Sequence, residues 1–83
     1  MYVHIGNNEI LNKDDVIAIL DVKTIMESRQ NLRIINKLKE RNDPADQSVI
    51  IVQRGKNEEN IFTNIAVSTL KKRLEMDLEE MFS

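Results

Sequence analysis

The stretch VIAILDV, residues 16–22, is a nearly continuous run of apolar, mostly β-branched side chains. Such a run is typical of a strand that is covered on both faces, because a half-exposed strand alternates apolar with polar residues. A second run of this kind is VIIV, residues 49–52. These two segments predict the central strands of a small sheet, and the neighbouring segments can be assigned outward from them.

Upstream of the first run, two short apolar stretches alternate with polar turns. Residues 1–5 and 9–11 predict short strands separated by Gly6-Asn7-Asn8, since Gly and Asn tolerate positive φ. A second polar turn, residues 12–15, then leads into the run at 16–22. The N-terminal part is therefore expected to be two short strands followed by a central strand.

Downstream, the sequence predicts two helices and a hairpin. Thr24 and Glu27 have the spacing of a capping box, which predicts a helix from Thr24 to about Arg41, ended by the approach to Pro44. Residues 48–66 read as a hairpin around a polar loop at 55–59. Ser68 can cap a last helix, whose apolar stripe comprises Val67, Leu70, Leu74, Leu78 and Met81.

The resulting order is β-β-β-α-β-β-α in one domain, residues 1–83. We expect an α+β fold with a small mixed or antiparallel sheet of about five short strands and two helices. A chain of this size buries only about 60% of the surface that it exposes when unfolded, so its core is marginal. One such domain can hardly cover the runs at 16–20 and 49–52 on both faces. Homo-oligomerisation is therefore expected.

The composition excludes several kinds of site. The chain has no cysteine and a single histidine, His4, which argues against a disulfide framework and against a cysteine- or histidine-based metal site. No acid, base and nucleophile can be assembled into a catalytic site, and no glycine-rich phosphate loop is present. We expect no enzyme activity, no cofactor and no small-molecule substrate. Nothing reads as a signal peptide or a membrane span, so a cytoplasmic protein is expected.

Positive charge is concentrated in one segment, although the net charge is −2. Within residues 25–42 five basic and two acidic side chains sum to +3. Four of the basic residues recur every fourth position, namely Arg29, Arg33, Lys37 and Arg41. On a helix they would form a stripe that could follow a phosphate backbone. The alternative is a solvated face opposite Leu32, Ile35 and Leu38, and the sequence leaves both readings open.

A second basic cluster, Lys71-Lys72-Arg73, lies one turn into the last predicted helix. There it adds to the positive end of the helix dipole, which suits an anion. The alternative is pairing across one helical turn with Glu75 and Asp77.

Two parts of the sequence resemble the bacterial extracellular matrix regulatory proteins of the RemA/RemB type. The first is IGNNEI and DDVIAI within residues 5–19, and the second is SVIIV and NIFTNIAVSTLKKRL within residues 48–74. The opening MYVHIG and the motif STLKKR are closer to the RemB branch. Together the motifs extend over almost the whole chain.

The resemblance implies a small cytoplasmic regulator of biofilm-matrix genes that binds DNA and assembles into rings. The RemA branch has an arginine immediately before the strand that corresponds to VIAI, residues 16–19, where this chain has Asp15. It also has an arginine-rich loop where this chain has NDPADQS, residues 42–48. The DNA contacts of that branch therefore do not transfer. The candidate contacts to double-stranded DNA are instead Lys13, Arg54, Lys56, Lys71, Lys72 and Arg73. The acidic turns favour the alternative, an oligomeric structural or protein-interaction module that does not bind DNA.

Overall fold

A computed structural model describes the backbone of residues 2–6 and 9–82 and the side chains of 2–6 and 9–75. It confirms the α+β class, with five strands and three α-helices in the part of the chain that it describes. In chain order these elements are β1 (Tyr2–His4), β2 (Ile10–Asn12), β3 (Val16–Asp21), α1 (Val22–Ser28), α2 (Leu32–Arg41), β4 (Ser48–Arg54), β5 (Asn57–Thr63) and α3 (Val67–Phe82).

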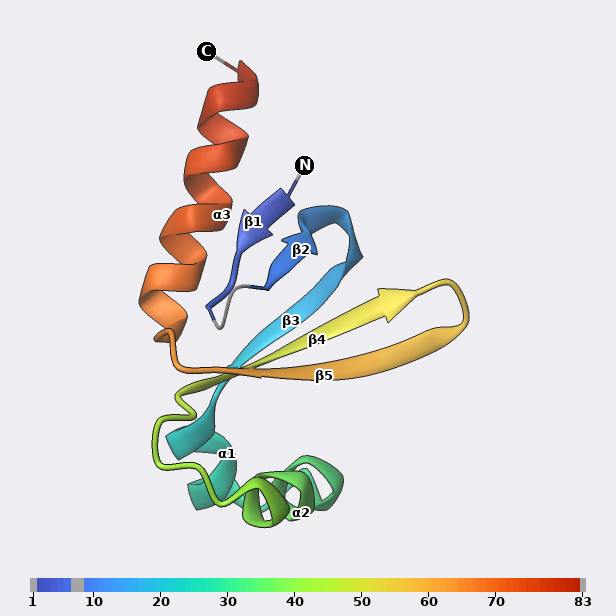
Figure 1. Cartoon of the computed structure of the whole chain (residues 1–83), viewed down its shortest axis with the longest axis vertical. Coiled ribbons are helices and arrows are strands. Elements are labelled where there is room, and N and C mark those ends of the chain that lie inside the picture. Colours follow the sequence, from blue (N-terminus) through green and yellow to red (C-terminus); the bar gives the residue numbers. More distant parts are fainter. Residues whose placement is uncertain (1, 7–8, 83) are drawn as a thin grey trace.

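The strands form two antiparallel sheets, where the sequence predicted one (Figure 1). One sheet is the β1–β2 hairpin, and the other has the order β3-β4-β5. Between β2 and β3 lies a short 3-10 helix, Lys13–Asp15. Asn12 caps it: the Asn12 side chain accepts a hydrogen bond from the Asp14 backbone N–H at 3.0 Å. This capped turn redirects the chain, so β3 leaves the plane of the small hairpin and joins the larger sheet.

The central strand β4 is covered on both faces. Val49, Ile50 and Val52 are each at most 1% exposed. Successive side chains of a strand point to opposite faces. Ile50 and Val52 pack in a cluster with the N-terminal hairpin and α3, whereas Val49 packs in a second cluster with α1 and α2. The molecule therefore has three layers, with α1 and α2 on one side of the sheet and the hairpin and α3 on the other (Figure 1).

A single chain therefore buries Val49, Ile50 and Val52 without a partner and leaves Ile51 partly buried, so the expectation that one domain can hardly cover this run on both faces is wrong. The run at 16–20 behaves differently. The register between β3 and β4 shifts between Val16 and Ala18, and the extra residue, Ile17, remains 56% exposed. A bulge of this kind turns one side chain away from the sheet, so β3 is not covered on both faces along its whole length.

The predicted helix from Thr24 to Arg41 is two helices. Asp21, and not Thr24, caps the first: its side chain accepts a hydrogen bond from the Thr24 backbone N–H at 3.0 Å. Arg29 then adopts a left-handed conformation with φ 54°, which ends α1. The Asn31 side chain caps α2 by accepting from the Ile34 N–H at 3.2 Å. Both caps are of the residue types that helix N-termini favour.

The β4–β5 hairpin is tighter than the sequence predicted. Arg54 pairs with Asn57, which leaves Gly55 and Lys56 as a two-residue loop. Gly55 has φ +61°, and a glycine with positive φ at the first loop position is typical of a type II′ turn. This turn matches the twist of the strands, so the hairpin extends to its tip and presents Lys56 there.

Two buried hydroxyls join the ends of β4 and β5 to the rest of the chain. Ser48 and Thr63 pair across the strands and are each at most 1% exposed. Thr63 donates to the Ile5 carbonyl, and Ser48 donates to the Ile65 carbonyl at 2.7 Å. Each buried hydroxyl thus has a partner, and together the two bonds anchor the N-terminal hairpin and the entry to α3.

α3 packs on the sheet through the first half of its apolar stripe. Leu70 is 1% exposed and belongs to the cluster with Ile50 and Val52, while Leu74 is only partly buried. Leu78 and Met81 lie outside the described side chains. Leu70 is therefore the most buried apolar residue by which the described part of α3 packs on the sheet.

Leu70→Ala should lower the free energy of unfolding by about 2–5 kcal/mol, because it removes apolar contacts and leaves a cavity in a closed cluster. Urea denaturation followed by circular dichroism measures this. The matched variant Lys72→Ala, at an exposed position of the same helix, should unfold within about 0.5 kcal/mol of wild type. Equal unfolding midpoints for the two variants would show that α3 does not pack as described.

Candidate nucleic-acid interface

The six residues predicted to contact DNA do not form one site. Lys13 points inward: its Nζ is buried and has no hydrogen-bond partner among the described residues. The side chain lies beside a small enclosed cavity whose lining includes Leu11, Val16 and Leu74. The expectation that Lys13 faces outward is therefore wrong, because the 3-10 turn directs it under the N-terminal hairpin.

Two of the predicted arginines are engaged within the chain. The Arg54 Nη1 lies 3.2 Å from the Glu59 Oε2 across the hairpin. The Arg73 Nη1 donates to the His4 carbonyl at 2.9 Å and so ties α3 to β1. Arg73 therefore has a structural role that a charge reversal at this position would disturb.

The remaining three, Lys56, Lys71 and Lys72, are exposed. Lys56 is at the hairpin tip, whereas Lys71 and Lys72 are on α3, and these two elements extend in different directions (Figure 1). The structure therefore leaves these three lysines available to a partner but does not gather them.

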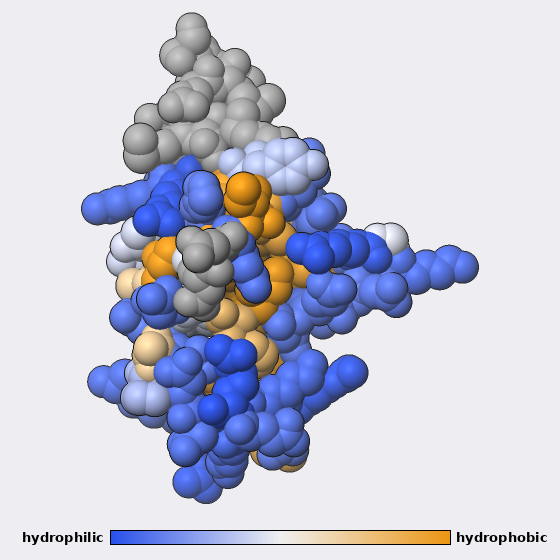
Figure 2. All heavy atoms as spheres, in the orientation of Figure 1, coloured by the Kyte–Doolittle hydropathy of each residue, from blue (hydrophilic) through white to orange (hydrophobic). Residues whose placement is uncertain are grey.

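The largest concentration of positive charge lies instead on α1, α2 and the connector between them, which we call the α1–α2 layer (residues 22–41). It holds six basic residues and two acids, a sum of +4. In the view of Figure 2, hydrophilic side chains cover this end of the molecule, and apolar ones gather at the level of the sheet and the N-terminal hairpin. The basic residues are Lys23, Arg29, Arg33, Lys37, Lys39 and Arg41.

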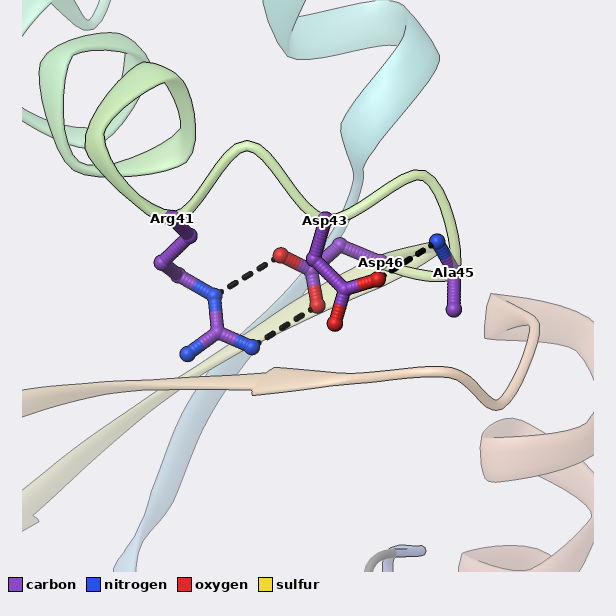
Figure 3. A network of polar contacts seen from close by, with 4 residues as sticks. All are labelled: Arg41, Asp43, Ala45 and Asp46. Atoms are coloured by element: carbon purple, nitrogen blue, oxygen red, sulfur yellow. Dashed lines mark hydrogen bonds and ion pairs between the residues drawn. The ribbon is translucent and has the colours of Figure 1, made fainter.

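Arg41 does not belong to an open stripe. Its Nε and Nη2 donate to the two carboxylate oxygens of Asp46 at 2.7 and 2.9 Å (Figure 3). Its guanidinium also lies 4.7 Å from the centre of the Phe62 ring. The Asp46 side chain is only 5% exposed. This hydrogen bonding to Asp46 raises the pKa of Arg41. Ala45 N–H donates to Asp43 at 2.9 Å in the same loop, so the acidic residues there fix the end of α2.

The helix break at residues 29–31 also interrupts the predicted basic stripe. Arg29 lies in the connector, and only Arg33 and Lys37 remain one turn apart on one side of α2. Ile34, Ile35 and Leu38 are buried against the sheet. At 100° per residue, Arg33 and Lys37 with the exposed Asn36 face away from these three. We call Arg33, Asn36 and Lys37 the outer side of α2.

A third side of α2 borders an open groove. Leu32, Ile35 and Lys39 on α2 and Met26 and Arg29 on α1 line a hollow of about 290 Å³. This groove was not predicted from the sequence, because the helical pattern assigned Leu32 to the buried face, whereas it is 65% exposed.

The described residues contain no group of three or more histidine, aspartate or glutamate side chains placed to hold a metal ion. Among the same residues, no helix has the length and apolar character needed to cross a membrane. No family model matches the chain, and neither the curated proteins nor the solved structures contain a match. The likeness to the RemA/RemB type therefore depends on the motifs quoted above.

Lys13→Met should leave the melting temperature equal to that of wild type or raise it, because it replaces a buried ammonium without a described partner by an apolar side chain of similar length. It should also leave any affinity for DNA unchanged. Differential scanning fluorimetry and fluorescence anisotropy check the two parts. A loss of DNA affinity with an unaltered melting temperature would indicate that Lys13 is exposed and contacts DNA, and would contradict its burial.

Proposed function

We propose that the chain is a cytoplasmic, non-enzymatic DNA-binding regulator of transcription that acts as a homo-oligomer, and that its α1–α2 layer contacts the duplex. The observation that carries this proposal is the charge of that layer. Of its six basic residues only Arg41 makes an ion pair among the described residues. The five others leave a local excess of positive charge on one face of an acidic chain.

Local charge matters more here than the net charge of −2. At physiological salt the Debye length is about 8 Å, so exposed charges farther away are largely screened. The sheet separates the α1–α2 layer from the N-terminal hairpin and from α3 (Figure 1). A phosphate backbone close to α2 would therefore be governed by the cations of this layer.

The arrangement of α1 and α2 also suits a duplex. The two helices are joined by three residues, 29–31, and α2 has ten residues, or about 15 Å of helix. In the DNA-binding helix-turn-helix motif, two helices joined by a turn of three or four residues place the second helix in the major groove. Arginine and asparagine, which stand at positions 33 and 36 on the outer side of α2, are residue types that read guanine and adenine. This support is a geometric analogy, and it adds to the charge argument.

A homo-oligomer fits the modest charge of one chain. One subunit offers few phosphate contacts, whereas several subunits on one duplex multiply them through effective concentration. The RemA/RemB resemblance points to a ring and to biofilm-matrix genes as the regulated targets. Both remain part of the proposal.

A second candidate function is an oligomeric protein-interaction module that does not bind DNA. The exposed apolar side chains of the same layer favour it: Leu32 is 65% and Met26 is 37% exposed. Such side chains are typical of a surface that binds protein. The two candidates differ in one observable, which is binding to duplex DNA at low salt.

Fluorescence anisotropy with a labelled duplex across a salt series tests the proposal. Wild type should bind, with a log–log salt slope of roughly −0.9 for each phosphate neutralised. Arg33→Glu combined with Lys37→Glu should weaken binding at least about tenfold and flatten the slope, since both contacts become repulsive.

Lys71→Glu combined with Lys72→Glu makes the same charge change on α3 and serves as the competing site. If this variant loses binding while the α2 variant keeps it, contact lies on α3 and the proposed interface is wrong. If wild type does not bind at low salt, the protein-interaction module replaces the DNA-binding protein.

A further inference from the structure

The groove between α1 and α2 is longer than the hollow beside Leu32. A second hollow of about 480 Å³ shares Met26 and Lys39 with the first and continues past Leu38 to the loop at Asp43. The combined groove runs along one side of both helices. It differs from the outer side of α2, which carries Arg33 and Lys37.

The groove has an apolar floor, and its rim is basic beside Leu32 but carries Asp43 and Asp46 at the loop end. Met26 and Leu32 expose apolar surface into it, and Ile35 also lines it. Arg29 and Lys39 border it, and neither makes an ion pair among the described residues. A groove of this kind suits an amphipathic helix with apolar anchors about one turn apart and acidic neighbours.

We infer that this groove holds the acidic C-terminal segment, residues 75–82, of a second copy of the chain. The inference rests on the self-association in the proposed function and gives it a contact surface. The segment, EMDLEEMF, has four acids and no basic residue, which complements Arg29 and Lys39 at the basic part of the rim. Its backbone is helical as the end of α3. Between its acids the segment also contains the apolar residue types Met, Leu and Phe.

A second copy is required because the sheet separates the two surfaces within one chain. α3 starts on the sheet face where Leu70 packs with Ile50 and Val52. The groove helices cover the other face, where Ile25 packs with Val49. A contact that joins two different surfaces of identical chains is heterologous, and it produces a closed ring or an open filament.

Charge exchange tests the contact. Arg29→Glu with Lys39→Glu reverses the rim, and Glu79→Lys with Glu80→Lys reverses the segment. Size-exclusion chromatography with light scattering should show an assembly larger than a dimer for wild type at micromolar concentration. Each double variant alone should shift the mass to the monomer, and the chain that carries all four changes should recover the assembly.

A matched apolar pair provides a second readout. Leu32→Asp should dissociate the assembly and leave a folded monomer with the circular dichroism spectrum of wild type, because Leu32 is exposed in the isolated chain. Ile17→Asp alters a residue of similar exposure, 56%, which lies in β3 and does not line the groove. It should leave the mass unchanged.

The outcomes separate this inference from the proposed function. A monomeric wild type would overturn both self-association and the groove contact. Three results would overturn the groove contact alone. The assembly could persist in the rim variant, or the chain with all four charge changes could fail to recover it. The third is dissociation by Ile17→Asp and not by Leu32→Asp. If the chain with all four charge changes recovers the assembly, the groove contact is supported, whether or not the same samples bind DNA.

Discussion

The burial of β4 on both faces is the constraint on which the rest of the structure depends. Val49 faces one helical layer, and Ile50 and Val52 face the N-terminal hairpin and α3. A chain of 83 residues must therefore supply two covering layers for one three-stranded sheet. Each layer is thin, and this accounts for short elements, few fully buried side chains and apolar residues that stay exposed at the edges.

The same constraint explains why α1 and α2 are separate helices. In one continuous helix, at 100° per residue, Ile34 would lie about 180° from Ile25 and could not face the sheet with it. Both are buried in the cluster around Val49. The left-handed Arg29 and the Asn31 cap let each helix turn its own apolar face to the sheet. The break that completes the core also creates the groove and moves Arg29 out of line with Arg33.

Much of this fold follows from local sequence, and its departures have physical reasons. The central strands, the hairpin and the α+β class were predictable, because continuous β-branched runs favour buried strands and turn residues favour a turn within a few positions of the chain. The helix break was missed because Ile25, Leu32 and Ile35 also fit one helical stripe, so the pattern alone does not show that Leu32 is exposed and Ile34 buried. Asn31 was the available signal, as a residue type that favours a helix start.

The candidate site was less predictable, because charge in the sequence does not say which side chains the fold uses. Arg73 bonds to the carbonyl of His4, which is 69 positions away in the chain. The burial of the Lys13 ammonium likewise depends on how the hairpin packs over the sheet. The Arg41–Asp46 pair spans five residues and removes the last cation of a regular stripe. Lys56, Lys71 and Lys72 are exposed on the elements that the sequence predicted for them, the hairpin loop and the last helix.

The central claim is that the α1–α2 layer is the surface through which this protein binds its partners. Hydrogen–deuterium exchange of the wild-type chain, measured in dilute solution, at high concentration and with duplex DNA, tests it most directly. The account predicts that amides of residues 22–41 become protected, with the Arg33–Lys37 turn most sensitive to DNA and the Met26–Leu32 region most sensitive to concentration. Protection confined to the hairpin tip at Gly55–Lys56 and the start of α3, with unchanged exchange across residues 22–41, would contradict it.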